Sequence, residues 1–496
     1  MLFNVGYWSA IAFPQALGDT FLKKFHITTK EVGYIYSITF MCSIILCPLI
    51  GVVISRFGIP NIALLLSLCI FTGNLVTYFG VRGDSFGLLL FGRFLFSLGA
   101  ETILIAQNSA SEKWFSRRLL SISMGVNSSC GVAFGSLSNF LTPILMVEDR
   151  NLEIAFLYHA YGGAISCLSV ALFNILDWKY AGLLQNQLDE DASKNSKIDS
   201  EGPQELTEDN RIGQIAQKST ENKSKNNKKY VFEINHLWKL GPLYWSCVGI
   251  YTFASNAYFQ FTKVITNTIV HRFGYSYLKA KNFYSIIQIS SAVLMPLNSI
   301  LIQNHGRKLK VLLFATASLL VAYTLMLLSP ATPSLSFSVA IVFVILFQIT
   351  YQTTIFPSLA MCLPRDAVSI GFGIASFVQC LFLTALPPVL GSIIQDETVA
   401  KFQIILFVFL AMAGIGGLWV LVTMRIDFKL GGILDAPENS EKAQKGRARL
   451  DARFKRLVAL GRSAGRTGAA GAVTIGDVSE NRSSNVVKVG RTFGES

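Results

Sequence analysis

The chain has 496 residues, of which 51% are hydrophobic and only 15% are charged, and it carries a formal net charge of +13 and a mean hydropathy of +0.46. These values exclude an ordinary soluble protein of several domains. They predict an integral membrane protein.

The charged residues lie in clusters and leave uncharged windows that predict membrane spans, since a helix crosses a bilayer with about 20 residues. The windows are 32–55, 57–81, 119–147, 154–176, 240–262, 282–306, 367–395 and 402–424. The uncharged run 311–364 contains SPATPS at 329–334, a turn signal that divides it into two spans. With 2–18, which lacks the basic region of a cleavable signal, and about 86–108, we predict an all-α membrane protein of about twelve transmembrane helices.

The fourth predicted span carries one acid, Glu101, in an apolar run. An ionised carboxylate facing lipid costs several kcal/mol, so Glu101 must face protein or water. Two interpretations remain open: a substrate or proton site, or a neutral carboxyl group that is hydrogen-bonded to a neighbouring helix. Asn108 shares the helical face of Glu101. Arg93 lies about 12 Å away along the axis and is turned by about 80°, so we expect no direct pair between Glu101 and Arg93.

All eight cysteines fall inside predicted spans and show no metal-ligand spacing. We therefore interpret them as small apolar residues and predict neither disulfides nor a metal site. His159, in the sixth span, could relay protons, although a single histidine can equally be held by hydrogen bonds alone.

Two polar segments divide the chain. Residues 177–239 are poor in large apolar side chains and predict a disordered cytoplasmic linker, and residues 426–496 predict a disordered basic tail beside anionic lipid. The domains are then a six-helix bundle over 1–176 and a second one over 240–425. Short loops carry similar numbers of basic residues on both sides, so only the linker and the tail favour an inside location.

Polar residues in the seventh predicted span follow steps of four, four, three and four: Thr252, Asn256, Gln260, Lys263 and Asn267. This spacing places them along one stripe of a helix, which is typical of a helix that lines a wet cavity. The alternatives are hydrogen bonds between helices in a dry core and, for Lys263, an ammonium group that extends to the interface.

Further polar and aromatic residues are candidates for solute binding. Tyr251 and Tyr258 flank the stripe and could stack on a ligand or form hydrogen bonds with it. Spans eight, ten and eleven supply uncharged amides that suit either a polar solute or helix packing: Gln288, Gln348, Gln352 and Gln379. Phosphate-binding glycine loops, HExxH and a GxSxG in a strand-turn-helix context do not occur in the sequence. We predict a protein that is not an enzyme, with no cofactor and no nucleic-acid partner.

Two pairs of segments repeat between the predicted halves. GVVISRFGIPNIALLL, after the second span, is similar to NSILIQNHGRKLKVLLF, after the eighth, and aligns Gly58 with Gly306 at an offset of 248. SISMGVNSS is similar to VSIGFGIAS and aligns Gly125 with Gly371 at an offset of 246. A parallel repeat of this size predicts a duplicated six-helix unit with a site between the halves. Chance similarity among apolar segments is the alternative.

The repeat, the Gly58 and Gly306 loops and above all GRFLFSLGAETILIAQNSASEKWF resemble the major facilitator superfamily, and within it the branch of lysosomal dipeptide uniporters. The resemblance runs from about Tyr7 to Arg425 and includes FPQAL in the first span, Lys263, RFGYS at 272–276, and FPSLAMCLP through GFG. It implies two six-helix bundles that move dipeptides or amino-acid-like solutes by alternating access in a lysosomal or other endomembrane. A sugar or organic acid carrier and a membrane scaffold or receptor are the alternatives, and the plasma membrane is the alternative location.

The resemblance also implies roles for individual residues. Glu101 matches the acidic residue of the fourth helix, which suits the amino group of a substrate. Structural or gating roles fall to Arg93, Gly58, Gly306 and Arg307. Besides the solute and the lipid bilayer, the implied partners are a glycosylated accessory membrane protein of the lysosome and a second copy of the chain.

The sequence departs from the family pattern at several positions. Val132 stands where the fifth-helix arginine is expected. The acidic residue of the loop motif is replaced by Ser55 in the first half and by Gln303 in the second. An acidic dileucine sorting signal is not apparent, and YAGL at 180–183 lies very close to the membrane.

Overall fold

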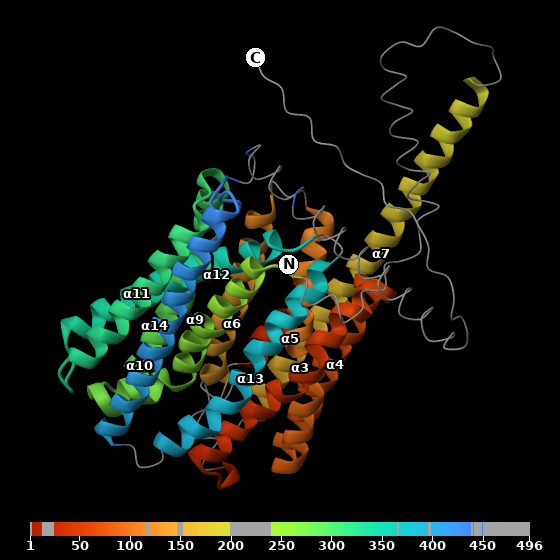
Figure 1. The fold of residues 1–496 in the computed structure, drawn as a ribbon. Helices are drawn as coiled ribbons and strands as arrows, with labels where there is room; N and C mark the ends of the chain where they lie inside the picture. Colours follow the sequence, from red (N-terminus) through yellow and green to blue (C-terminus); the bar gives the residue numbers. More distant parts are fainter. Residues whose placement is uncertain are drawn as a thin grey trace, which may run out of the picture. The chain divides into compact units, whose positions relative to one another are not determined.

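A computed structural model describes residues 2–11, 24–115, 119–145, 152–198, 240–364, 367–394 and 398–437, with residues 440 and 449. Within these ranges the chain forms twelve α-helices and one short π-helical turn, η3, at Thr268–Arg272 (Figure 1). The helices are α1 (Val5–Ile11), α3 (Thr29–Phe57), α4 (Ile59–Arg82), α5 (Phe86–Trp114), α6 (Leu120–Leu145), α7 (Leu152–Ile198), α9 (Pro242–Asn267), α10 (Tyr277–His305), α11 (Lys308–Leu328), α12 (Leu335–Met361), α13 (Val368–Ile394) and α14 (Val399–Lys429).

Nine of the described helices are long and apolar enough to cross a membrane. Two helices continue past the predicted domain boundaries. α7 continues to Ile198, into the segment predicted as linker, and α14 continues to Lys429, past the predicted tail boundary at 426. Residues 199–239 and 12–18 lie outside the described residues. The rest of the predicted tail does too, apart from residues 426–437, 440 and 449.

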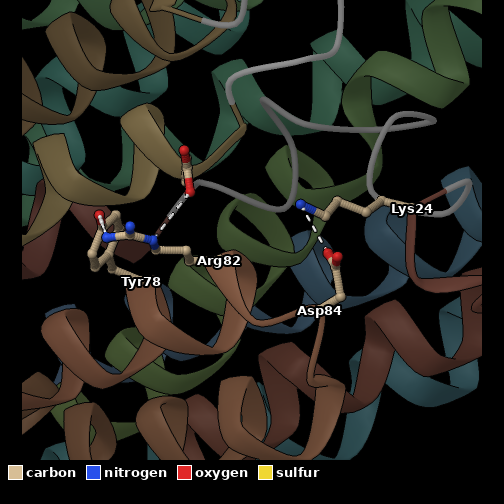
Figure 2. Close-up of polar contacts among 5 residues, drawn as sticks. Lys24, Tyr78, Arg82 and Asp84 are labelled. Carbon is tan, nitrogen blue, oxygen red and sulfur yellow. Dashed lines mark hydrogen bonds and ion pairs between the residues drawn. The ribbon is translucent and has the colours of Figure 1, made fainter.

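Several helices begin at side-chain caps. Thr28 and Glu31 form a reciprocal capping box at α3, and the side chain of Ser85 accepts a hydrogen bond from the amide of Leu88 at α5 (3.3 Å). At this end of the bundle Lys24 forms an ion pair with Asp84 (3.0 Å), and Arg82 donates to the Tyr78 hydroxyl, as Figure 2 shows. The ion pair joins the segment just before α3 to the loop between α4 and α5, whereas Arg82 and Tyr78 both belong to α4.

Helix packing follows the sequence repeat. α4 packs on α5 and on α7, and α11 packs in the same way on α12 and on α14. α3 packs on α5 as α10 packs on α12. The two halves meet where α3 contacts α13 (Figure 1) and where α6 contacts α10. In the repeat, α3 corresponds to α10 and α13 corresponds to α6. A pseudo-two-fold axis between the halves therefore relates the α3–α13 contact to the α6–α10 contact.

Glycines permit the close contacts between the halves. A Cβ atom at Gly51 of α3 would lie 2.6 Å from the Ile370 Cα atom of α13, and one at Gly125 of α6 would lie 2.7 Å from the Ser299 Cβ atom of α10. In addition, the Ser129 hydroxyl donates to the Ala292 carbonyl (2.5 Å). The backbones of the two halves are therefore packed closely in this structure.

The loops after α3 and α10 have related geometry. Gly58 (φ 89°) and Gly306 (φ 67°) end these helices with positive φ angles, which L side chains rarely adopt, and the next helix begins within one or two residues. The Gly306 loop is also covered by the segment after α14: the Arg307 amide donates to the Asp435 carbonyl (2.9 Å) and the Leu309 amide donates to Asp435 Oδ1 (3.1 Å).

Arg272, in the RFGYS segment, is buried and has a structural role. Its Nη2 atom donates to the carbonyls of Met326 (3.3 Å), Leu327 (3.1 Å) and Ser329 (3.4 Å) at the end of α11. A guanidinium group in this position compensates for carbonyls that the end of a helix leaves without partners.

Candidate functional site

A cavity of about 100 Å³ lies between the halves. Its walls come from α1, α3, α5 and α6 of the first half and from α9, α10, α12 and α13 of the second. One buried water needs about 10–15 Å³ measured in this way, so the cavity has room for several waters or for part of a small solute. Most lining side chains are aromatic or carry uncharged amides.

Glu101 reaches the cavity from α5 and is only 4% exposed. Its Oε1 atom accepts a hydrogen bond from the hydroxyl of Tyr7 on α1, and the Tyr7 ring stacks on Phe96 (6.3 Å between centroids). Among the described residues, no donor reaches Oε2 of Glu101. One carboxylate oxygen is therefore held by the protein and the other is available to a ligand.

Lys263 reaches the same cavity from α9, in the other half. Its Nζ atom lies over the rings of Tyr36 (5.0 Å) and Phe40 (4.9 Å) of α3, an arrangement that stabilises a cation without neutralising it. In the described part of the chain this buried atom has no hydrogen-bond acceptor. Such atoms are usually satisfied by water or a ligand.

Glu101 and Lys263 interact electrostatically but do not form an ion pair among the described residues. A cation and an anion thus face one cavity from opposite halves. Because a direct pair would leave neither charge for a solute, the separation is the feature that allows binding of a molecule with two charged ends.

The face of α9 that meets the cavity differs from the predicted one. Tyr251, Tyr258 and Lys263 line it, whereas Asn256 and Gln260 do not. Gln260 donates instead to the Phe382 carbonyl of α13 (2.9 Å), and Asn256 donates to the Thr252 carbonyl of its own helix (2.8 Å). Successive residues of an α-helix are turned by about 100°, and on this basis the cavity-lining face of α9 is rotated by roughly 100° from the polar stripe. Only Lys263 belongs to both the lining face and the stripe.

The glutamines divide into two groups. Gln288 and Gln348 reach the cavity wall but are tied to each other, with Gln348 donating to Gln288 (3.0 Å). Gln379 donates to the Ser255 hydroxyl (3.1 Å) and keeps a buried carbonyl oxygen with no partner among the described residues. Gln352 also lines the cavity. Gln352 and Gln379 are therefore better placed for a solute than Gln288 and Gln348.

Several lining residues have no strong sequence signal. Gln107 lies six residues after Glu101 in α5, about 1.7 helical turns further along the axis and away from Arg93. Neither end of its buried amide has a partner among the described residues. Trp8 Nε1 of α1 and Asn4 Oδ1, just before α1, also have no partner among the described residues. For Asn4 the only signal in the sequence was its polarity within a short apolar segment. Trp8 gave no signal, because its neighbours are also apolar or aromatic.

The residues expected to have structural or gating roles lie outside the cavity wall. Arg93 is buried, donates to the Ala10 carbonyl (3.2 Å) and lies over the Phe96 ring. Gly58, Gly306 and Arg307 belong to the two loops described above. His159 is buried near Ser138 (3.4 Å) and also lies away from the cavity. Val132, at the position of the expected arginine, is buried as well.

Comparison with known proteins shows the family of the chain. The sequence profile of the Major Facilitator Superfamily matches residues 2–387. The chain is 23% identical over 445 residues to the lysosomal dipeptide transporter MFSD1 of Danio rerio, covering 87% of each chain. It is 22% identical over 431 residues to the protein of that name from Homo sapiens, covering 85% of this chain and 83% of the other.

Solved structures agree on the fold. The human organic anion transporter MFSD10 has a TM-score of 0.58 at 14% identity and covers 84% of this chain and 97% of its own. The proton:xylose symporter XylE, bound to a glucose derivative, has a TM-score of 0.58 at 12% identity and covers 86% of this chain and 93% of its own.

Proposed function

Since the chain belongs to the major facilitator superfamily, we propose that it carries a small zwitterionic solute, a dipeptide or an amino-acid-like molecule, across a membrane by alternating access. The observation that carries this proposal is the pair of opposite charges, Glu101 and Lys263, that face one cavity from different halves. The relatives described as lysosomal dipeptide transporters support the substrate class.

The proposed binding mode follows from the charges. The ammonium group of the solute pairs with Glu101, whose Oε2 atom is available, and the carboxylate pairs with Lys263. The amides of Gln107, Gln352 and Gln379 serve the peptide group, which offers one donor and one acceptor. Tyr251 and Tyr258 lie beside them and contact the side chains of the solute.

Opposite charges on the two halves also favour closure of the halves around a bound zwitterion. A zwitterion that contacts Glu101 and Lys263 at once stabilises the state in which both halves close around it, and a ligand shifts a conformational equilibrium only through such differential contacts. Release then requires separation at the α3–α13 and α6–α10 contacts on one side.

We propose a lysosomal or other endomembrane location, because these relatives are described as lysosomal transporters. Uniport, a glycosylated accessory membrane protein and a homodimer are further proposals, which rest on the resemblance of the sequence to the family alone. Val132 bears on the proposed substrate, because it replaces the fifth-helix arginine that would bind the carboxylate of the solute. In the proposed mode Lys263 takes that role.

Uptake into proteoliposomes that contain the purified full-length protein tests the proposal. Radiolabelled dipeptide is competed with unlabelled dipeptides, single amino acids, sugars and organic acids. We expect dipeptides or amino acids to compete and the other two classes not to compete. Absence of saturable dipeptide uptake, or competition by sugars or organic acids as strong as that by unlabelled dipeptide, would contradict the proposal.

A carrier of organic anions is the second candidate. Lys263 is a cation in the cavity with no described hydrogen-bond partner, whereas Glu101 accepts a hydrogen bond from Tyr7, which a neutral carboxyl group accepts as well as an ionised one. In that case organic acids without an amino group would compete, and Glu101→Gln would leave their uptake intact. A scaffold or receptor that does not cycle would bind its ligand but show no uptake.

A further inference from the structure

A second cavity, of about 910 Å³, lies away from the central site, at the end of the bundle where α11 begins and α14 ends. Three basic side chains line it: Lys310 in the first turn of α11, and Arg425 and Lys429 near the end of α14. Arg425 and Lys429 are four residues apart and share a helical face. α11 and α14 pack against each other, so the three cations converge on one place.

The segment after α14 forms the remaining wall. Asp427 Oδ1 accepts hydrogen bonds from the amides of Ile433 (3.0 Å) and Leu434 (3.1 Å), which folds residues 430–434 back against the helix end. Asp435 Oδ1 accepts from the Leu309 amide at the start of α11 (3.1 Å). Together these contacts attach the segment to both helices.

Both acids that line the cavity are therefore already engaged. Asp427 and Asp435 are bound to backbone amides, and Asp435 also sits at the N-terminus of α11, where the helix dipole favours a negative charge. Lys310, Arg425 and Lys429 are exposed, and none forms an ion pair or a hydrogen bond with a described residue. Within the described part of the chain, the cavity thus presents three cationic groups without an anionic partner.

The surroundings indicate that this anion is presented by a membrane. α14 and α11 are both candidate spans, so their ends lie at the level of the lipid headgroups. Phe428, which lines the same cavity between Arg425 and Lys429, is 85% exposed. An exposed phenyl ring beside two cations suits the boundary between headgroups and acyl chains, where apolar and basic side chains of one helix are both accommodated.

We propose that Lys310, Arg425 and Lys429 form a binding site for the phosphate of an anionic phospholipid headgroup. Three convergent cations favour a headgroup with more than one negative charge, such as a phosphorylated inositol lipid, over a zwitterionic one. The acyl chains then lie along α14 beside Phe428. Because Asp435 anchors the same wall to the Gly306 loop between α10 and α11, a bound lipid also holds that loop to the end of α14.

Binding of short-chain lipids to the purified full-length protein in detergent tests the site. The probes are dioctanoyl phosphatidylinositol phosphate, dioctanoyl phosphatidylcholine, free inositol phosphate and inorganic phosphate, measured by thermophoresis. The variant is K310Q/R425Q/K429Q. The matched control, K279Q/K281Q/K401Q, removes the same charge near the starts of α10 and α14, at the other end of the bundle.

We expect the phosphoinositide to bind the native protein and the control equally, and to bind the triple variant at least about tenfold more weakly, with no binding of phosphatidylcholine. Equal binding to the triple variant, or no phosphoinositide binding to the native protein, would overturn the proposal. Free inositol phosphate that binds as tightly as the lipid would make the ligand a soluble phosphate and overturn the lipid assignment. Lys429→Gln alone, expected to weaken binding by a smaller factor, decides the matter if the triple variant unfolds.

Discussion

At the scale of single residues, the central site depends on two charges that the protein leaves only partly satisfied. Tyr7 holds one oxygen of Glu101, and two aromatic rings hold the ammonium group of Lys263. A buried charge without a full set of partners is costly. Such a cost is understandable where a ligand completes the interactions, and Glu101 and Lys263 are the two charged residues that the described cavity wall contains.

Glu101→Gln tests the acidic half of this arrangement. The substitution keeps the size of the side chain and an acceptor for the Tyr7 hydroxyl but prevents a negative charge, so we expect normal expression and membrane insertion. Uptake of the dipeptide into proteoliposomes should fall at least tenfold, which corresponds to about 1.4 kcal/mol of lost stabilisation. Asn108→Ala is the control, since Asn108 lines the same cavity without a charge, and it should reduce uptake less. An unchanged rate in the Gln variant at every pH tested would leave Glu101 with a structural role.

At the scale of elements, α9 shows what helical periodicity can and cannot predict. The spacing correctly groups Asn256, Gln260 and Lys263 on one side of the helix, but periodicity does not say which neighbour that side meets. Gln260 contacts the backbone of α13. The face of α9 that lines the cavity is rotated by roughly 100° from the polar stripe and contains Tyr251, Tyr258 and Lys263.

Cysteine labelling along α9 distinguishes the two faces. In a variant whose eight native cysteines are replaced, a cysteine at Phe259, in the cavity wall, should react with a water-soluble thiol reagent, and dipeptide should slow the reaction. A cysteine at the adjacent Gln260 should be inert, because that side chain packs on α13. Reaction at 260 with protection by solute, and none at 259, would show that the stripe faces the solute after all.

The contact between α3 and α13 leads to a further prediction about movement. A side chain at Gly51 would overlap the backbone at Ile370, so Gly51→Val should keep the two helices apart at this point and favour the open state there. We expect the variant to fold, to bind dipeptide more weakly and to lose most of its uptake. Gly414→Val is the control, because a Cβ atom at Gly414 makes only an ordinary contact with Leu320 (3.9 Å). Uptake that Gly51→Val leaves intact would mean that this contact does not have to close.

At the scale of the whole molecule, the sequence predicted the helices and the duplication better than the site. Uncharged windows mark spans because the bilayer core excludes charge, and an acid alone in such a window was enough to single out Glu101. Tyr7 and Trp8 could not be found in this way, since aromatic residues in an apolar segment look like packing. Asp435 was missed because the chain after 426 was predicted as tail, and its contacts with the Gly306 loop depend on tertiary structure.

The central claim is that Glu101 and Lys263 bind opposite ends of one solute, and end-blocked dipeptides test it most directly. Binding of a dipeptide, its N-acetyl form and its C-terminal amide is measured for the native protein, Glu101→Gln and Lys263→Gln. We predict that each block weakens binding to the native protein at least tenfold, that Glu101→Gln no longer distinguishes the N-acetyl form, and that Lys263→Gln no longer distinguishes the amide. If both variants discriminated against both blocked forms as strongly as the native protein does, the two charges would not bind the ends of the solute.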